Sequence, residues 1–224
     1  MKKLLLSLGL FAFVAATSVH ATEYGFDKAH SHVGFSVKHI LSMVPGEFKD
    51  YDGSFTFDAK RPEASKVDVT IQTASISTDN EMRDHHLQSP DFFDAAKYPT
   101  LTFKSTKVEK GEGENQYKVT GDLTIHGVTK SVVLAVDYQG ADEMPMGKDG
   151  KMVAKIIAFS ATTKIDRRDF GLSWGQDKLT SAGNLMVAND INIKLDVAGM
   201  DKKSLDAMKA MMGKMKKEKA ADSK

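Results

Sequence analysis

Residues 116–138 read QYKVTGDLTIHGVTKSVVLAVDY, and the apolar side chains of this stretch fall on alternate positions. They are Tyr117, Val119, Leu123 and Ile125 in the first half, and Val132, Leu134, Val136 and Tyr138 in the second. A period of two indicates half-buried strands, because successive side chains of a strand point to opposite faces of the sheet. The dipeptide His126-Gly127 between the two halves predicts a tight hairpin turn with a positive φ at the glycine.

The same period recurs along most of the chain. The further sets are Val33, Phe35 and Val37; Phe55 and Phe57; Val67, Val69 and Ile71; Leu101 and Phe103; Ile157, Phe159 and Ile165; and Ile191, Ile193, Leu195 and Val197. Alternation is typical of antiparallel sheets, whereas strands of parallel sheets are continuously apolar. We therefore expect an all-β fold of about eight antiparallel strands. Periodicity alone does not distinguish a sandwich from a closed barrel.

Four segments interrupt this pattern. Residues 78–87 begin with capping residue types and predict a short helix, and residues 89–93 predict a second one. Together they are expected to form a helical insertion over one end of the sheet. Residues 111–115 and 140–150 are polar and contain glycine, so we expect both to be loops.

The N-terminus has the layout of a signal peptide. Two lysines give residues 1–3 a positive charge, and residues 4–16 form an apolar run that is too short to span a bilayer. Residues 19–21 match a small-residue cleavage site. We therefore expect residues 1–21 to be removed during export and the mature chain to begin at Thr22. The chain has no cysteine, so no disulfide or thiol nucleophile is available.

Residues 22–199 are expected to form one domain, followed by a separate tail at 200–224. The chain has a net charge of +1, but lysines are concentrated in the first three residues and in the tail, which leaves the domain mildly acidic. An acidic body argues against a nucleic-acid groove, because binding phosphates needs a clustered basic surface.

The tail has the pattern of an amphipathic helix. Leu205, Met208, Met212 and Met215 recur at steps of three and four, and Lys209, Lys214, Lys216 and Lys217 surround them. Such a face suits transient contact with a membrane surface, a groove on a partner protein, or a frayed helix with no partner.

Catalytic and metal-binding patterns are incomplete. Residues 171–175, GLSWG, match the nucleophile elbow of hydrolases, but no histidine follows Ser173 and residues 176–178 lack a helical period. His30 and His32 share one strand face, yet no third ligand accompanies them. We therefore expect no catalytic residue, no metal and no cofactor.

Several longer stretches resemble the YceI-like polyisoprenoid-binding family, in unbroken order from about Tyr24 to Val197. They are residues 27–39, 46–53, 92–94 with 98–99, 121–129 and 165–172. The resemblance implies a lipocalin-like antiparallel barrel, exported to the periplasm, that holds a polyisoprenoid, an isoprenoid quinone or a fatty amphiphile in its bore. It says nothing about the tail, and a homodimer stays open.

On this interpretation the bore is lined by inward-facing apolar residues, with two more near a mouth. The expected lining is Phe35, Val37, Phe57, Val69, Phe103, Ile125, Leu134, Phe159 and Ile193, and the residues near the mouth are Phe170 and Trp174. Lys38, Arg83 and Arg167 are candidates for binding a pyrophosphate or a quinone carbonyl. Two alternatives stay open: an enzyme acting on such a lipid, and a structural barrel whose core is filled by side chains.

Overall fold

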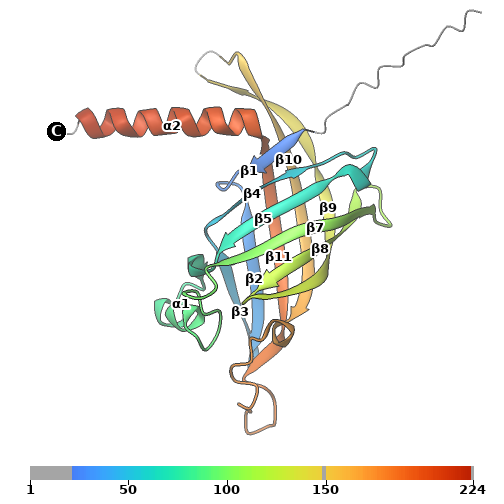
Figure 1. Ribbon diagram of the computed structural model, residues 1–224, viewed down its shortest axis with the longest axis vertical. Coiled ribbons are helices and arrows are strands. Elements are labelled where there is room, and N and C mark those ends of the chain that lie inside the picture. The colour runs from blue at the N-terminus through green and yellow to red at the C-terminus, as the bar shows by residue number, and fades with distance from the viewer. Residues whose placement is uncertain (1–21, 148–149, 223–224) are drawn as a thin grey trace, which may run out of the picture.

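The computed structural model describes residues 22–147 and 150–222, and its core is a closed antiparallel barrel (Figure 1). Eight strands are hydrogen-bonded in a ring, because β11 pairs back onto β1. In ring order they are β1 (Glu23–Phe26), β4 (Tyr51–Thr56), β5 (Lys66–Gln72), β7 (Thr100–Lys110), β8 (Gln116–Ile125), β9 (Val128–Met146), β10 (Met152–Asp166) and β11 (Val187–Asp201). The expected lipocalin-like barrel of about eight antiparallel strands is confirmed.

Three further strands extend one side of the barrel wall. They are β2 (His32–His39), β3 (Ser42–Phe48) and β6 (Ile76–Ser77). The long strand β11 pairs with β2 through its first part and with β1 through its last residues, so β2 continues the line of β1. Strand β3 pairs with β2 and then with β6.

The hairpin predicted at His126-Gly127 joins β8 to β9. Ile125 pairs with Val128, and both turn residues have positive φ, 52° at His126 and 75° at Gly127. This is the geometry of a type I′ turn, whose twist matches that of the flanking strands. A side chain at Gly127 would also meet the ring of Tyr98, since an added Cβ would lie 2.6 Å from it.

Of the two helices predicted in the insertion, one forms. Helix α1 spans Glu81–Gln88, and the side chain of Asn80 caps it by accepting a hydrogen bond of 3.0 Å from the backbone of Arg83. The second helix, predicted over residues 89–93, is wrong: this segment consists of turns in which Ser89 O accepts from the backbone of both Phe92 and Asp94.

The loop predicted over residues 140–150 is wrong for residues 140–146, which are part of a strand, whereas residues 147 and 150 lie outside any strand as expected. Strand β9 continues to Met146 and pairs with β10 beyond a bulge opposite Ala158 and Phe159, where Gly140 has a φ of 135°. Polar residues form this extended ribbon because tertiary contacts support it: Met146 packs with Ala154, Met200 and Leu205. The loop predicted at residues 111–115 is present between β7 and β8.

The tail forms helix α2 (Lys202–Asp222), which leaves one end of the barrel, while α1 and the loop after the short 3-10 helix η3 (Arg167–Phe170) lie toward the other end (Figure 1). Ser204 and Leu205 are buried, whereas Met212 and Met215 are 53% and 61% exposed. Only the start of α2 therefore packs on the barrel. Within the described residues, no helix combines the length and apolarity needed to cross a bilayer.

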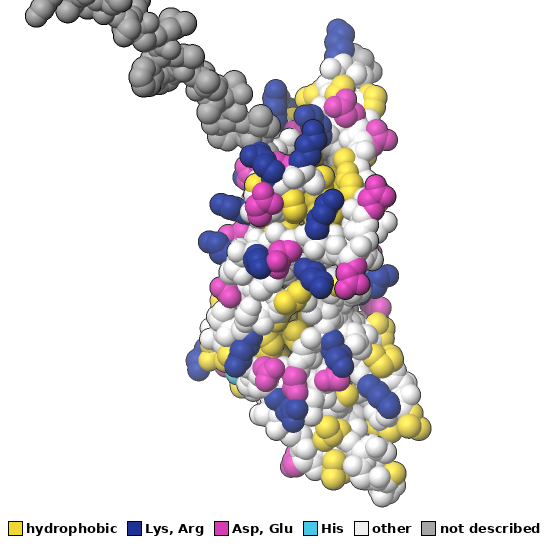
Figure 2. Space-filling model, turned by 90° about the vertical axis from the view of Figure 1, so that its right-hand side faces the viewer, with side chains coloured by type: hydrophobic (Ala, Val, Ile, Leu, Met, Phe, Trp, Pro, Cys, Tyr) yellow, Lys and Arg dark blue, Asp and Glu magenta, His cyan; other side chains and the backbone are white. Residues whose placement is uncertain are grey.

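Two further 3-10 helices, η1 (Pro62–Ala64) and η2 (Thr73–Ser75), connect strands at the rim. On the outer surface, basic and acidic side chains are interspersed over the face shown in Figure 2. Neither sign of charge dominates that face.

Candidate functional site: the barrel cavity

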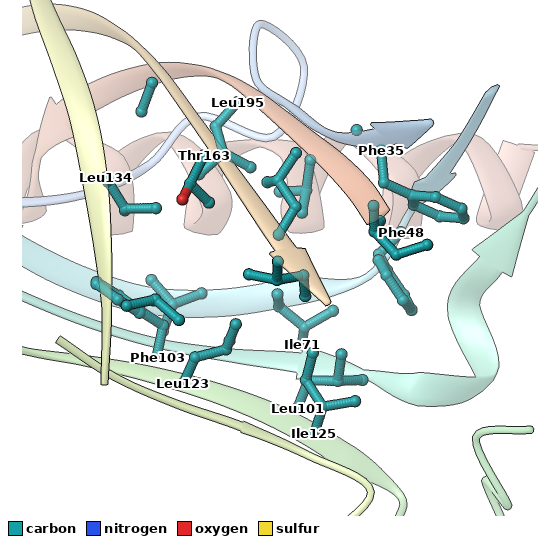
Figure 3. A pocket seen from close by; sticks show the side chains of 18 of the residues that line it. Phe35, Phe48, Ile71, Leu101, Phe103, Leu123, Ile125, Leu134, Thr163 and Leu195 are labelled. Atoms are coloured by element: carbon teal, nitrogen blue, oxygen red, sulfur yellow. The ribbon is translucent and has the colours of Figure 1, made fainter. Parts of the chain in front are cut away.

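The bore of the barrel holds a cavity of about 470 Å³. Its wall is made mostly of aliphatic and aromatic side chains that project inward from the strands, including Phe35, Leu101, Leu134 and Leu195 (Figure 3). A volume of this size lies in the range of small-molecule sites, roughly 300–1,000 Å³. The bore is therefore open rather than completely filled by side chains.

All eleven residues expected to line the bore or its mouth border this cavity. They are Phe35, Val37, Phe57, Val69, Phe103, Ile125, Leu134, Phe159, Phe170, Trp174 and Ile193. They come together because each lies on the inward face of its strand, directly after strand β4 as Phe57 does, or on the segment that follows β10. That they contact a ligand stays a prediction.

The cavity is also bordered by residues that were not among those expected to line it. Examples are Phe48, Phe55, Leu101, Tyr117, Leu123 and Leu195. Most of them share a strand face with a named residue, as Leu101 does with Phe103, so the alternation already pointed to them. Phe92 and Phe93 also border the cavity, but they lie on turns, where no periodicity announces which way a side chain points.

An aromatic cluster, called here the Phe57 cluster, lies in the bore at the end nearest α2. The ring of Phe57 lies 5.3 Å from Tyr117, 5.1 Å from Tyr138 and 5.0 Å from Phe159, measured between centroids. Burial raises the pKa of the Tyr117 phenol, as expected for an apolar setting. Among the described residues, this end of the cavity offers contacts to a hydrocarbon chain and no charged group.

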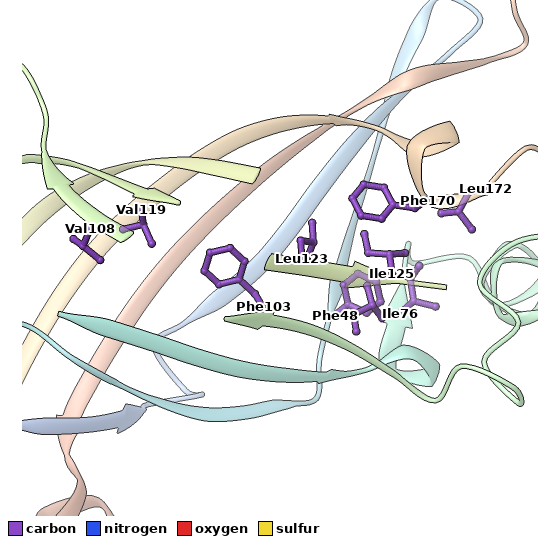
Figure 4. Packing of buried hydrophobic residues seen from close by; sticks show 10 residues of the cluster. Phe48, Ile76, Phe103, Val108, Val119, Leu123, Ile125, Phe170 and Leu172 are labelled. Atoms are coloured by element: carbon purple, nitrogen blue, oxygen red, sulfur yellow. The ribbon is translucent and has the colours of Figure 1, made fainter. Parts of the chain in front are cut away.

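At the other end, apolar side chains from different segments meet around α1. Phe48 and Ile76 pack there with Phe170 and Leu172 (Figure 4). Further out, the rings of His86, Phe92 and Trp174 pack against one another, with centroids 5.0 to 5.1 Å apart. These three residues, called here the mouth cluster, cover the cavity at the α1 end.

Arg83 and Arg167 border the cavity at this same end. Arg83 is exposed on α1, and its guanidinium donates to the hydroxyl and the carbonyl oxygen of Thr78, at 2.7 and 2.8 Å. Lys38, the third candidate for a headgroup contact, does not border the cavity. It is exposed because it alternates with the inward-facing Val37 on β2.

Arg167 is buried, with 3% of its surface exposed. Its Nε donates to Ala188 O at 3.1 Å, and its Nη1 donates to Leu172 O at 2.9 Å and to Trp174 O at 2.8 Å. Its Nη2 has no hydrogen-bond partner among the described residues. Burial lowers the pKa of this guanidinium from its usual value.

The groups considered for catalysis or metal binding lie apart. Ser173 is in a turn, where its carbonyl accepts from the backbone of Gln176 at 3.2 Å, and no helix follows it. His30 contacts Asp27 at 2.7 Å, whereas His32 contacts Glu47 at 3.0 Å. Over residues 22–147 and 150–222, no three His, Cys, Asp or Glu side chains cluster as a metal site would require.

Comparisons with known proteins agree with this architecture. Protein YceI of Escherichia coli O157:H7 is 44% identical over 176 residues, which are 77% of this chain and 88% of that protein. The crystal structure of the Campylobacter jejuni YceI protein is 41% identical, has a TM-score of 0.60, and covers 79% of this chain and 96% of its own.

A polyisoprenoid-binding domain from Saccharophagus degradans has the same fold, with a TM-score of 0.57 at 13% identity over 80% of this chain and 98% of that one. A family model described as the YceI-like domain matches residues 24–199. Because that match spans the whole barrel, the chain belongs to the YceI-like domain family.

Proposed function

We propose that this protein binds a polyisoprenoid or similar long-chain amphiphile in its barrel and carries or sequesters it in the periplasm. The observation that carries the proposal is the cavity: an open bore with an apolar wall and an aromatic cluster at one end, whose two charged side chains, Arg83 and Arg167, lie at the other. Such polarity matches a molecule with one hydrocarbon chain and one polar head. The polyisoprenoid-binding neighbour supports this ligand class.

Burial of the ligand's hydrocarbon chain alone supplies enough free energy for binding. Ten methylenes at about 0.8 kcal/mol each contribute roughly 8 kcal/mol, which corresponds to about micromolar affinity before ordering costs. A quinone with an isoprenoid side chain and a fatty acid meet the same requirement. The chain therefore contributes most of the affinity, and the head adds selectivity.

We infer binding rather than catalysis. Among the described residues, no Asp or Glu borders the cavity, whose titratable side chains include the two arginines and two histidines, His39 and His86. The ring of His86 packs against Phe92 and Trp174 and contacts Asp91, which does not border the cavity, at 3.2 Å. Acid–base catalysis needs a pair of groups matched to proton donor and acceptor roles, and arginine holds its proton throughout the physiological range. The family resemblance supports the same conclusion.

A matched pair of variants on β9 tests the carrier function. Leu134 borders the cavity, whereas the neighbouring Val133 points outward and is 50% exposed. The exported protein is extracted with organic solvent and the extract is analysed by mass spectrometry. We expect lipid in the parent protein and in Val133→Trp, and its loss from a folded Leu134→Trp. No lipid in the parent, together with no binding of added geranylgeraniol, would overturn the proposal.

Residues 1–21 lie outside the described residues, and export stays a proposal that rests on their sequence. N-terminal sequencing of the protein recovered from a periplasmic extract should begin at Thr22. An intact Met1 on a protein that stays in the cytoplasm would contradict both the cleavage site and the location.

A further inference from the structure

Arg167 is held rigidly in the wall of the cavity by three backbone carbonyls. Ala188 belongs to the start of β11, and Leu172 and Trp174 belong to the loop after η3, so the guanidinium joins two segments at the α1 end. These bonds use Nε and Nη1. The orientation of the remaining nitrogen, Nη2, is therefore set by the fold before any ligand arrives.

The Nη2 atom is buried and has no acceptor among the described residues. A buried donor is rarely left without a partner, because burial removes its hydrogen bond to water and an unpaired donor gains no other bond in exchange. Arg167 borders the cavity, so a molecule in the bore is positioned to supply the missing acceptor.

The charge around Arg167 is also unbalanced. The adjacent Asp166 is engaged by Arg168, whose Nε donates to both carboxylate oxygens at 2.9 and 3.0 Å. No acidic side chain of the described residues borders the cavity, whereas a second arginine, Arg83, does. A buried guanidinium whose neighbouring carboxylate is already hydrogen-bonded to another arginine favours an anion over a neutral acceptor.

We propose that Arg167 Nη2 binds an anionic oxygen of the ligand head, a carboxylate or a phosphate, while the chain extends toward the Phe57 cluster. This inference rests on the proposed carrier function and narrows its ligand class, because a neutral alcohol would gain less from the same contact. Arg83, exposed at the rim, adds a second positive charge on the path by which the head enters.

The test compares three probes with one chain: geranylgeraniol, geranylgeranoic acid and geranylgeranyl phosphate. Trp174 is the only tryptophan of the chain and lies in the mouth cluster, so its fluorescence reports binding directly. We expect the wild type to bind the acid, the phosphate or both at least about tenfold more tightly than the alcohol, as expected for a charge-assisted hydrogen bond. The acid and phosphate arms distinguish the two anionic heads.

Arg167→Met should abolish this preference, so that the ratio of its affinity for the acid or the phosphate to its affinity for geranylgeraniol falls to about one. Arg167→Lys keeps the positive charge without the fixed fork, so we expect it to retain part of the preference. Arg61→Met is the matched control, because Arg61 is paired with Asp58 on the surface and does not border the cavity. It should bind all three probes as the wild type does.

Equal affinity of the wild type for all three probes would overturn the inference while leaving the carrier function intact. So would an unchanged anion preference in Arg167→Met. If that variant does not fold, the wild-type comparison and Arg167→Lys decide: a Lys variant with the full preference would contradict a role for Nη2. Failure of every probe to bind the wild type would instead count against the carrier function itself.

Discussion

His86 and Trp174 meet edge to face, with ring centroids 5.1 Å apart and planes at 88°, although one lies on α1 and the other on the loop after η3. Phe92 completes the cluster from the turn that follows α1. Edge-to-face contacts of this kind hold two segments together without a covalent link. These three side chains therefore link α1 to the loop after η3 at the mouth of the cavity.

Shortening Trp174 to alanine should speed the release of ligand. The variant removes two of the three ring contacts of the mouth cluster but no strand contact, so we expect dissociation at least about threefold faster, since most affinity differences appear in the off-rate. Transfer of radiolabelled geranylgeraniol to excess vesicles measures this rate. Leu179→Ala, on the same loop at a residue 56% exposed, is the control. An unchanged rate in Trp174→Ala would show that the cluster does not limit exit.

Phe103→Trp tests whether the bore is open along its length. The ring of Phe103 lies against the backbone of Gly121, where an added Cβ would be 2.4 Å from it, and it borders the cavity. Added bulk costs about 1–3 kcal/mol in a filled core. In an open bore it takes up ligand space instead, so we expect a nearly normal melting temperature and loss of the longest co-purifying lipid.

The matched control for this variant is Lys104→Trp, which places the same ring on the outer face of β7. It should retain the full lipid content. A clear fall in the melting temperature of Phe103→Trp, with no extractable lipid in either the variant or the parent, would favour the alternative in which side chains fill the core.

Two truncations separate the docked part of α2 from its exposed part. Leu205 is 4% exposed and packs over Gly25 of β1. Removing residues 203–224 should therefore lower the free energy of unfolding by about 1.5–3 kcal/mol, the value of one buried leucine. Removing residues 209–224 should leave it nearly unchanged, because Met212 and Met215 are exposed. Urea unfolding measures both, and an equal loss in the two truncations would place the docking contacts further along the helix.

The exposed methionines and the lysines beside them, such as Lys209 and Lys214, suit an anionic membrane surface, and we propose that this part of α2 makes a transient membrane contact. Sedimentation with vesicles of phosphatidylethanolamine and phosphatidylglycerol should recover the full chain but not the 209–224 truncation. Equal recovery of both proteins would contradict the proposal. Equal recovery of the full chain with vesicles of pure phosphatidylcholine would show that the negative charge of the membrane is not required.

The fold around the start of α2 should become less stable in acid, because part of its stability depends on the charge of Asp201. Burial raises the pKa of this carboxyl, but hydrogen bonds from the backbone of Lys155 and Ser204, at 2.8 and 3.0 Å, outweigh it and lower the pKa below its usual value. A lowered pKa in the folded state stabilises the fold at neutral pH, and this contribution is lost as the pH falls from about 4 through the folded-state value.

Asp201→Asn should cost about 0.5–1.5 kcal/mol at pH 7, because the amide cannot accept both hydrogen bonds, and the difference from the wild type should shrink in acid. Urea unfolding at pH 7 and pH 3 measures both effects. Asp206→Asn, exposed on the same helix, should change little at either pH. A cost for Asp201→Asn that is the same at both pH values would show that its charge is not involved.

The sequence by itself determined the strands whose apolar residues alternate, their inward faces and the hairpin at His126-Gly127. These features are local: side chains alternate along any strand, and a glycine with positive φ needs only its own backbone. For this reason Phe35, Phe103 and Leu134 were recognised as lining residues without knowledge of their neighbours. The short helix predicted over residues 78–87 from its capping residue types forms over residues 81–88, because a helix cap is also a local feature.

Only the tertiary structure decided whether the sheet closes, whether its bore is open, and which charged groups enter it. Closure depends on the pairing of β1 with β11, at opposite ends of the chain, and the polar ribbon of β9 and β10 depends on its packing with Leu205. Arg167 and Arg168 are neighbours of one residue type, yet the turn of η3 buries the first among carbonyls and leaves the second paired with Asp166 near solvent. Alternation along a strand does not extend through such a turn, so the orientation of each arginine is set by the segments packed around it.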